Sequence, residues 1–599
     1  MSAVSILAPS RAFLGVTRSI MGRPWRDRCG DPAAQAYAAT MVQAHGLPDL
    51  LARVLASRGI RPDETAAYLE PRLRDLMPDP SRLVDMETAA ERLAHAVEAG
   101  ERVAVFGDYD VDGAASAALM AGYLRALGLT VDIHIPDRIT EGYGPNVAAV
   151  TALAEGGATL LVCVDCGTSG HEPLAAAAER GLAVIVLDHH GAPEILPPVE
   201  ALVNPNRLDD ISGLGHLCAA GVVFLTLVAL NRRLRRGGRE DLPDLAEALD
   251  LVALATVADV VPLTGLNRAF VVQGLKVMRG RGRIGLAALF DAASLSEPPE
   301  SWHLGYLLGP RINAGGRIGH AGLGAALLTS GDPAEATRIA TELDRLNRER
   351  QGIEAQAVLE AEAEMDRALT LAPDTPILVT ASASWHPGVV GLVAARLKER
   401  FGRPAFAFAL RPDGTATGSG RSVAGVDLGH AVREAVDAGL LVKGGGHAMA
   451  AGATLPSHDP THLSDFLAAA LASAVSEARA VEALLVDGTV NAGGATAEVV
   501  RLVQRAGPFG AGAPEPVFAL PYHRLVDAAI VGNGHVRARF RSRDGQAIGA
   551  IAFRSAQGPL GQALLGGIGQ EFHVAGTLAI DTWRGGERVQ LRVGDLAAP

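Results

Sequence analysis

The sequence predicts an α/β protein with a parallel-sheet core, a second α/β domain joined to it by a long helix, and a C-terminal β-barrel. Short apolar runs alternate with helical segments from residue 102 onward, which is typical of βαβ units. A long charged helical segment begins at Asp332-Pro333, and short strands separated by Gly and Asn fill residues 484–596. Because 599 residues are too many for one hydrophobic core, we expect three or more domains.

The parallel sheet is expected within residues 91–330, after a helical N-terminal region over residues 1–90. Its strands are predicted at four short apolar runs, with helices over residues 113–127 and 172–180. The runs cover residues 103–106, 131–135, 160–164 and 183–187. Since ligands of such sheets collect beyond the carboxyl ends of the strands, the residues that follow each run are the first candidates for a site.

Acidic and imidazole side chains directly follow three of these strands. They are Asp108, Asp110 and Asp112 after the first, Asp165 after the third, and Asp188-His189-His190 after the fourth. Crowded carboxylates are unfavourable without a cation. Mixed carboxylate and imidazole ligands suit Mn²⁺ or Mg²⁺ better than structural Zn²⁺. The sequence therefore predicts a metal site at this edge, where two ions would activate water for phosphoryl transfer.

Each motif has a simpler interpretation when it is taken alone. The acidic triplet could be an exposed turn or a calcium loop, although an EF-hand needs flanking helices and a strand precedes this motif. The adjacent His189 and His190 could be a packed pair. Asp259 ends an apolar run over residues 251–258, so it is either an exposed helix-end acid or a buried carboxylate that needs a partner.

The second half of the chain is predicted to contain three further regions. A helical connector spans residues 331–372, where Asp332 can cap the helix and Pro333 fits its first turn. A second α/β domain spans residues 373–478, and a strand-rich domain spans residues 479–599. Strands of that last domain are expected at residues 525–527, 529–531, 536–540 and 548–553.

Bulk composition excludes some classes of protein and weakens others. The net charge of −12 argues only weakly against nucleic-acid binding, because binding depends on the local potential of a surface and not on the charge of the whole chain. Four cysteines are too few for a disulfide framework, and the Cys163-x-x-Cys166 pair is better explained as packing than as half a zinc site. The longest apolar run, residues 219–230, is too short to cross a bilayer, so we expect a cytoplasmic protein without membrane contact.

Four motifs, in this order, resemble the metal motifs of the Asp-His-His (DHH) phosphoesterases. They are GDYDVDG at 107–113, VDCG at 164–167, DHH at 188–190 and ATVAD at 255–259. The resemblance implies that two ions are bound, that Asp165 bridges them, and that His190 contacts the scissile phosphate or assists proton transfer. The implied metal ligands are Asp108, Asp110, Asp112, Asp165, His189 and Asp259.

Later motifs resemble the RecJ branch of that superfamily. GPRINAGGR at 309–317 follows the catalytic core, and the motifs at 385–391, 419–422 and 444–447 resemble the associated substrate-binding domain. The segment 506–518 resembles the lead into an OB-fold, with Ala513 where relatives commonly carry Asn. The implied substrate-binding residues are Arg311, Asn313, Arg317, Trp385, Ser419, Arg421, Ser422, Gly445, Gly446 and His447. Base stacking is expected to rest on few aromatics, with Trp385, Phe509 and Phe518 as candidates.

The resemblance implies a single-stranded-DNA-specific 5′→3′ exonuclease that releases 5′-mononucleotides in DNA repair and recombination. It also implies recruitment by single-strand-binding protein and cooperation with a RecQ-type helicase, and we expect a monomer. A phosphodiesterase acting on short oligonucleotides or cyclic dinucleotides is the alternative, although such relatives generally lack the C-terminal barrel. A non-catalytic scaffold is disfavoured because every expected ligand type is present.

Overall fold

The computed structural model describes residues 12–581 and 586–599, which divide into two compact units. The terminal unit contains the described residues up to Leu76, Pro262–Ala269 and those from Glu482 onward. The central unit contains Met77–Val261 and Phe270–Val481. Helix α11 (Gly265–Arg279) contributes residues to both.

The central unit is built on a five-stranded parallel sheet in the order β3-β2-β4-β5-β6. Its strands are β2 (Val103–Phe106), β3 (Val131–His134), β4 (Leu160–Val164), β5 (Ala183–Leu187) and β6 (Ala201–Val203). The four predicted strands are confirmed, whereas β6 was not predicted. Because β2 and β4 are buried along their whole length, they appear as unbroken apolar runs in the sequence.

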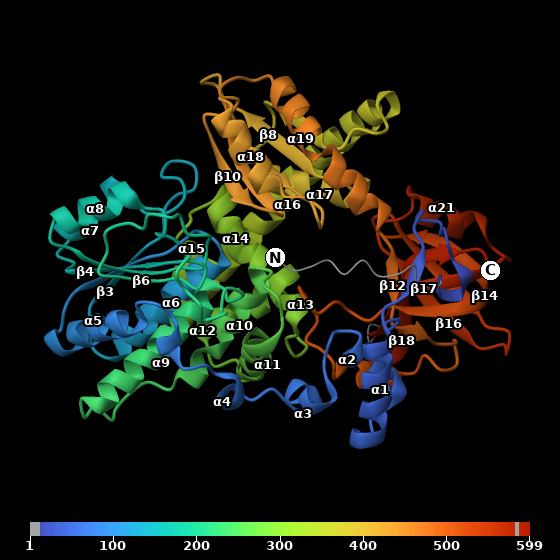
Figure 1. The fold of residues 1–599 in the computed structure, drawn as a ribbon, viewed down its shortest axis with the longest axis horizontal. Coiled ribbons are helices and arrows are strands. Elements are labelled where there is room, and N and C mark those ends of the chain that lie inside the picture. Colours follow the sequence, from blue (N-terminus) through green and yellow to red (C-terminus); the bar gives the residue numbers. More distant parts are fainter. Residues whose placement is uncertain (1–11, 582–585) are drawn as a thin grey trace. The chain divides into compact units, whose positions relative to one another are not determined.

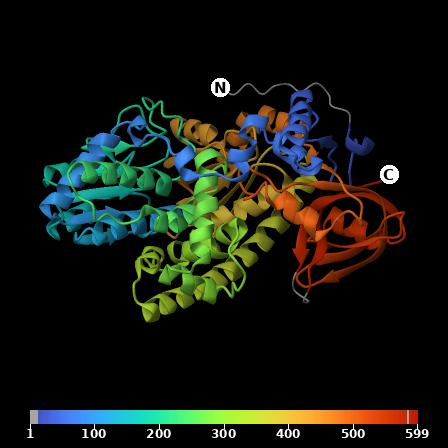
Figure 2. The ribbon, with the colours of Figure 1, turned by 90° about the horizontal axis from the view of Figure 1, so that it is seen from below.

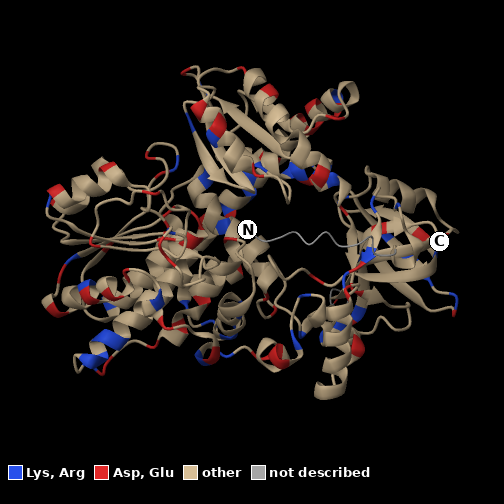
Figure 3. Ribbon diagram, viewed as in Figure 1, with Lys and Arg blue, Asp and Glu red and all other residues tan. Residues whose placement is uncertain are grey.

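Helices cover both faces of this sheet, as Figure 1 shows. On one face lie α7 (Val147–Glu155) and α8 (His171–Glu179). On the other lie α5 (Met86–Ala99), α6 (Val111–Ala126) and α9 (Ala219–Arg236). The C-terminal end of α9 carries the cluster of basic residues visible in Figure 3.

A group of helices completes the first domain and leads into the connector. They are α10 (Leu249–Ala258), α12 (Ile284–Ala292), α13 (Ser301–His303), the π-helix η5 (Leu304–Leu308), α14 (Gly309–Ile318) and α15 (Leu323–Thr329). The connector is α16 (Pro333–Leu371), a helix of 39 residues whose first turn is capped by Asp332 through Ala334 N at 3.0 Å. The predicted connector helix is confirmed.

The second α/β region has a five-stranded mixed sheet in the order β10-β11-β9-β8-β7. The strands are β7 (Leu378–Ser382), β8 (Ala405–Leu410), β9 (Ala416–Arg421), β10 (Lys443–His447) and β11 (Ala450–Leu455). Its helices are α17 (Val390–Phe401), α18 (Leu428–Asp437) and α19 (Thr461–Ala480). Three of the motifs singled out in the sequence lie on or beside these elements.

In the terminal unit, strands β14 to β18 close into a barrel because β14 pairs with both β15 and β17 (Figure 2). The strands are β13 (Gly488–Thr489), β14 (Phe518–Val531), β15 (His535–Arg541), β16 (Ala547–Ala552), β17 (Glu571–Asp581) and β18 (Arg588–Ala597). The prediction of two strands at 525–527 and 529–531 was wrong, since both belong to β14. A register shift between Leu525 and Asp527 breaks the alternation of buried residues there.

The N-terminal segment packs on this barrel. Strand β1 (Trp25–Asp27) pairs in parallel with β12 (Leu484–Val486), and Trp25 Nε1 donates to the buried Asp595 at 3.1 Å. The remaining helices of the unit are α1 (Pro32–His45), α2 (Asp49–Ala56), α3 (Thr65–Leu69), α4 (Leu73–Leu76), α20 (Ala497–Gln504) and α21 (Pro559–Gly566). At Ala513 the turn closes through two backbone hydrogen bonds with Gly510, so it needs no side chain at that position.

The fold shows where the four cysteines lie. Cys29, Cys163, Cys166 and Cys218 are all buried free thiols, and Cys163 and Cys166 pack in the apolar layer between the sheet and α7 and α8. Among the described residues, no helix is both long enough and apolar enough to cross a membrane.

Candidate metal centre

Asp165 occupies the turn that directly follows β4. Its backbone has a φ of +61°, and its N–H donates to Leu187 O at 3.0 Å, so neighbouring strands fix the turn. Asp108 follows β2, and both carboxyls are buried. Neither Asp108 Oδ1 nor Asp165 Oδ1 has a hydrogen-bond partner among the described residues. Two buried oxygens without donors are costly unless a cation meets them.

Asp110 and Asp112 lie at the start of α6. Asp110 caps the helix by accepting from Gly113 N at 3.1 Å. Gly113 is required because a Cβ there would lie 2.4 Å from the Asp108 carbonyl oxygen. Asp112 accepts from Ala219 N at 2.7 Å and Ala220 N at 2.9 Å, at the N-terminus of α9. The positive end of α9 thus holds this carboxylate in place.

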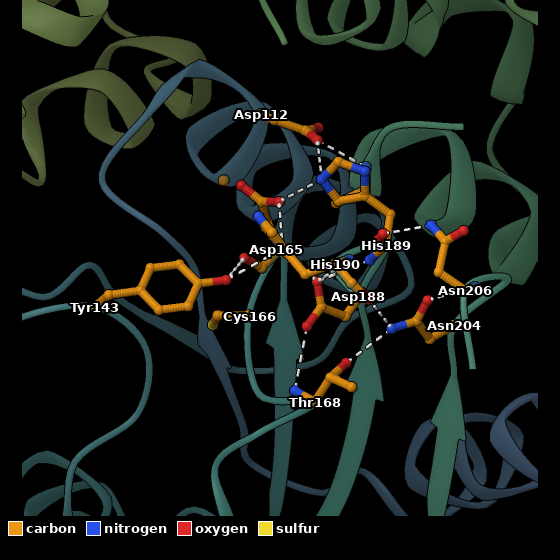
Figure 4. A network of polar contacts seen from close by, with 12 residues as sticks. Asp112, Tyr143, Asp165, Cys166, Thr168, Asp188, His189, His190, Asn204 and Asn206 are labelled. Carbon is orange, nitrogen blue, oxygen red and sulfur yellow. Dashed lines mark hydrogen bonds and ion pairs between the residues drawn. The ribbon is translucent and has the colours of Figure 1, made fainter. Parts of the chain in front are cut away.

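His189 points into the group of carboxylates (Figure 4). Its Nε2 lies 3.3 Å from Asp165 and 3.7 Å from both Asp112 and Asp259. Its Nδ1 lies 3.1 Å from Leu217 O. Because that carbonyl only accepts, Nδ1 carries the proton and the lone pair of Nε2 faces the carboxylates. Asp259 is the C-cap residue that directly follows α10.

Asp188 lies beside these residues, but its carboxylate oxygens already accept hydrogen bonds from protein donors. Its Oδ1 accepts from His190 Nδ1 at 2.8 Å and from His189 N at 2.7 Å, and its Oδ2 accepts from Thr168 N at 3.1 Å. Burial would raise the pKa of Asp188, but these donors hold it below its usual value. Asp188 therefore orients His190 and remains ionised.

The pKa of His190 reflects this partner. Burial lowers it, but the hydrogen bond to Asp188 and the charge of that carboxylate outweigh burial and raise the pKa to about 9. Nδ1 of His190 faces Asp188, so Nε2 is the ring nitrogen left for another partner. The His190 ring also stacks with that of His447 in the second α/β region, with centroids 6.2 Å apart.

The pKa values of the other carboxyls show how strongly they crowd each other. Burial, followed by the charges of neighbouring carboxylates, raises the pKa of Asp165 and of Asp108 well above the usual value. The same causes raise the pKa of Asp112 and bring that of Asp259 to about 9. Such a cluster favours either protons or cations.

Three groups of these side chains each place their ligand atoms within 4.8 Å of one another. The groups are Asp108, Asp110 and Asp165; Asp112, His189 and Asp259; and Asp165, His189 and His190. Asp165 thus belongs to two of them, and its Oδ1 lies 3.3 Å from His189 Nε2 of the remaining group. The donor set of carboxylate oxygens with one imidazole fits Mn²⁺ or Mg²⁺. The unpartnered oxygens of Asp108 and Asp165 agree with that fit.

Arginines gather beside the Asp108 and Asp110 side of the centre. Burial, with the charges of Arg138, Arg350 and Arg421, lowers the pKa of Arg317 to about 10. Arg138 lies over the Tyr109 ring at 5.2 Å, and Arg317 donates to Gly388 O at 3.0 Å. Guanidinium groups brought together in this way form a site for an anion.

Several residues implied by the motifs lie on α14, β9 and β10. Arg421 Nη1 donates to Ser419 Oγ at 2.9 Å, which aligns the two side chains on β9. Gly445, Gly446 and His447 lie on β10, where Gly446 has a φ of +145° and a Cβ would lie 2.3 Å from Ala450 O. Asn313 Oδ1 is buried and has no partner among the described residues.

Other implied residues have structural partners instead. Arg311 is paired with Asp344 of α16 at 3.0 Å, and the buried Ser422 donates to Val426 O at 2.8 Å. Trp385 is buried, and its Nε1 donates to Glu360 at 2.9 Å. Phe518 is buried in the core of the terminal unit. The expectation that Trp385 or Phe518 offers a stacking surface was therefore wrong.

Sequence reasoning missed Tyr143, Arg138, Asn204 and Asn206. Tyr143 OH lies 3.1 Å from His190 Nδ1 and 3.2 Å from Asp165 O. Asn204 and Asn206 donate to the carbonyls of His190 and His189 at 2.8 and 2.5 Å. One signal for Tyr143 was present, since Gly142 and Gly144 flank it and both adopt positive φ. Glycines around a single aromatic residue indicate a constrained loop.

Comparisons with known proteins agree with this geometry. Three family models match: the DHH family N-terminal domain over residues 102–256, the DHHA1 domain over 374–476 and the RecJ OB domain over 486–595. The single-stranded-DNA-specific exonuclease RecJ of Escherichia coli (strain K12) is 37% identical over 566 residues, covering 92% of this chain and 96% of that protein. The chain belongs to the RecJ family.

Solved RecJ structures agree with the fold. The crystal structure of Thermus thermophilus RecJ in complex with Mn²⁺ has a TM-score of 0.73 at 31% identity, covering 94% of this chain and 78% of that one. Its complex with Mg²⁺ has a TM-score of 0.69 at 29% identity, covering 94% and 77%. The predicted family, the DHH core and the OB barrel are confirmed. This RecJ-family chain is thus a metal-dependent hydrolase of the exonuclease class.

Proposed function

We propose that this chain degrades single-stranded DNA from its 5′ end, releasing 5′-mononucleotides during DNA repair and recombination. The observation that carries the proposal is the convergence of carboxylates and His189 around Asp165. It occurs in a chain that matches a single-stranded-DNA-specific exonuclease over 92% of its length.

The proposed ligands divide into two sets. We assign Asp165 to both, because it clusters with Asp108 and Asp110 and lies 3.3 Å from His189. Asp108 and Asp110 belong to the first set, and Asp112, His189 and Asp259 to the second. Two bound Mn²⁺ or Mg²⁺ ions would supply an activated water and stabilise charge on the phosphate. The protein fixes these ligands beforehand, through the α9 N-terminus for Asp112 and Leu217 O for His189.

His190 is proposed to act on the scissile phosphate. Asp188 keeps its ring oriented and positively charged, so Nε2 can donate to a phosphate oxygen or to the leaving oxygen. Tyr143 contacts the same ring nitrogen as Asp188 and limits the rotation of the imidazole. This arrangement favours one orientation of His190 before substrate arrives.

Phosphate binding is assigned to the arginine cluster. Arg317 and Arg421, with Ser419, belong to the implied substrate-binding residues, and Arg138 joins them in the structure. Their excess positive charge lies beside Asp110, within reach of the same substrate as the metal centre. We also assign phosphate contacts to His447 and to the backbone of Gly445 and Gly446 on β10.

The OB barrel is proposed to hold the single strand. Arg537, Arg539 and Arg541 alternate with buried residues on β15, so they form an outward row on the barrel. Such rows track the phosphate backbone of a single strand. A cytoplasmic monomer that cooperates with single-strand-binding protein and a RecQ-type helicase is the proposed cellular setting.

Digestion of end-labelled DNA tests the proposal. The full chain is incubated with 5′-labelled or 3′-labelled single strands, and with their duplexes, in Mn²⁺ or EDTA. The proposal expects metal-dependent release of labelled mononucleotide first from the 5′-labelled single strand, and its loss in Asp165→Ala. Release first from the 3′ label, or cleavage confined to oligonucleotides of a few residues, would overturn it.

A further inference from the structure

We propose that Glu141 is a positioning residue, which fixes the loop between β3 and α7 so that Arg138 and Tyr143 reach the metal centre from one segment. The loop spans residues 135–146. The inference rests on the proposed function and deepens it, because it names what holds two contacts of the same site in place. Glu141 acts through these two residues, since the partners of its own carboxylate lie at the ends of the loop.

Tyr143 connects the loop to His190. Its OH lies 3.1 Å from His190 Nδ1 and donates to Asp165 O at 3.2 Å (Figure 4). The rings of Tyr143 and His190 lie edge to face, with centroids 5.6 Å apart. The phenol thus contacts both the backbone of the shared metal ligand and the ring that is proposed to act on the scissile phosphate.

Arg138 connects the same loop to the arginine cluster. Its guanidinium lies over the Tyr109 ring, 5.2 Å from the ring centroid. Burial lowers the pKa of Arg421, and the positive charge of Arg138 lowers it further. Burial and the same charge also lower the pKa of Arg317. Arg138 therefore lies among the cations to which phosphate binding is assigned, a few residues before Tyr143 in the chain.

Packing alone does not fix this loop. The side chain of Tyr143 is 52% exposed and that of Ile139 is 48% exposed. Gly142 and Gly144, which flank Tyr143, have φ values of +88° and +78°. A Cβ on Gly142 would meet no described atom within 4 Å, so the backbone there has space to move. Because glycine loses more conformational freedom on folding than other residues, hydrogen bonds must offset that cost.

The Glu141 carboxylate joins the two ends of the loop. Its Oε1 accepts from Asp137 N at 2.9 Å, near the start of the loop. Its Oε2 accepts from Asn146 Nδ2 at 3.0 Å and lies 3.1 Å from Nε2 of His134, the last residue of β3. Burial would raise the pKa of Glu141, but these donors lower it below its usual value. The carboxylate therefore remains an ionised acceptor.

The two anchors of this carboxylate belong to a strand and to a helix. The His134 ring packs against the ring of Phe106 in β2, with centroids 5.0 Å apart. Asn146 is the N-cap of α7, and its side chain accepts from Ala149 N at 2.9 Å. Glu141 thus ties the loop to elements whose positions are set by the sheet and its covering helix.

Asp137 shapes the turn that contains Arg138. Its Oδ1 accepts from Ile139 N and Thr140 N, each at 2.9 Å. The N–H of Glu141 donates to Asp137 O at 2.8 Å. These contacts do not involve the Glu141 carboxylate, so its removal should leave the turn formed but detach it from β3 and α7. We therefore expect a loss of position and not a loss of folding.

A mutant cycle separates positioning from a general effect on stability. Glu141→Ala should lower kcat/KM for a single strand in Mn²⁺ by about 10- to 100-fold. In a chain that already carries Arg138→Ala and Tyr143→Phe, the same change should alter the value by no more than about 2-fold, because the contacts that Glu141 positions are gone. Glu141→Gln should give an intermediate loss, since its amide keeps one acceptor oxygen and places an NH₂ group opposite donors.

Glu155→Ala is the matched control, because it removes an exposed glutamate at the end of α7. It should leave kcat/KM at the wild-type value. Losses that simply add in the cycle, or a Glu141→Ala variant with wild-type kcat/KM, would overturn the proposal.

Hydrogen exchange of backbone amides gives a readout that does not depend on activity. In Glu141→Ala, exchange over residues 135–146 should speed up by about 10-fold or more, while that of α6 stays unchanged. Unchanged exchange in the loop would also overturn the proposal. A wild type that binds strands in EDTA but never cleaves would contradict the proposed function. The positioning role would then be decided by the same cycle measured on Kd, where Glu141→Ala should weaken binding only when Arg138 is present.

Discussion

The Asp188 carboxylate holds His190 by a 2.8 Å hydrogen bond to Nδ1, although the two residues are separated by a single residue in the chain. The same oxygen accepts from His189 N at 2.7 Å and from His190 N at 3.2 Å. The turn after β5 is thus held by three hydrogen bonds to one carboxylate oxygen of Asp188. It places His189 toward the metal ligands and leaves Nε2 of His190 for substrate.

Replacing this carboxylate should slow catalysis without abolishing binding. Asp188→Asn removes the charge that keeps His190 protonated and offers a donor where an acceptor is needed. We expect kcat to fall by roughly 10²-fold or more with a small change in KM. Steady-state kinetics with Asp209→Asn, an exposed aspartate, as control would measure this. A rise in KM of the same size, with kcat unchanged, would argue against the role given to Asp188.

Arg421 should contribute to phosphate binding. Arg421→Ala removes one cation of the cluster, so strand affinity should fall and the slope of log Kd against log salt should decrease by about 1. Arg396→Ala on α17, whose guanidinium pairs with Glu354 and Glu399, should leave the slope unchanged. Anisotropy titrations at several salt concentrations check this prediction, and an unchanged slope for Arg421→Ala would refute it.

The metal-free protein should become less stable as pH rises. Asp259 has its pKa raised to about 9 by burial and by the charges of Asp112 and Asp110. An acid with a raised folded pKa stabilises the fold below its unfolded pKa, about 3.9, and loses that contribution as pH rises toward the folded value. Each such group changes the free energy of unfolding by up to about 1.4 kcal/mol per pH unit.

Thermal unfolding in EDTA between pH 6 and pH 9 measures this effect. We expect the Tm to fall across that range, and Asp259→Asn to show a shallower fall because it removes one titrating carboxyl. Added Mn²⁺ should raise the Tm most at the high end of the range. A Tm that rises with pH in EDTA would contradict the crowding of these carboxylates.

Arg268 should be essential to the terminal unit. The buried guanidinium donates to Tyr68 O and Ala506 O at 3.1 Å and to Gly507 O at 2.5 Å, and lies 3.9 Å over the Tyr68 ring. Arg268→Met leaves those carbonyls without a donor and should cost about 3 kcal/mol or more. Urea unfolding would show this, with the exposed Arg279→Met as control. Equal urea midpoints for Arg268→Met and the wild type would contradict the prediction.

The sequence was most informative where the signal was local. Asp165 and the Asp188-His189-His190 run follow apolar strands, so the parallel sheet brings them to one edge and their convergence was predictable. Arg138 and Tyr143 were missed because they lie in the segment between β3 and α7, which has no periodicity. The glycines that flank Tyr143 indicate a constrained loop but not a site. Only the folded chain brings that segment to His190.

Burial was the property that sequence motifs predicted worst. Trp385 lies in a motif with glycines and a histidine, which indicated binding, yet its ring fills the core between α16 and α17. Conversely, Trp302 and Tyr306 carry no recognised motif and are exposed. Whether an aromatic side chain faces the core depends on tertiary packing, which local patterns do not encode.

Counting bound Mn²⁺ and released nucleotide in the same samples tests the central claim most directly. The wild type should bind two ions per chain and release 5′-mononucleotides from a single strand. Asp165→Asn, which keeps the shape of the shared ligand, should bind fewer ions and lose activity by roughly 10³-fold or more. Wild-type release in EDTA, or an Asp165→Asn variant that digests single strands at the wild-type rate, would contradict the account.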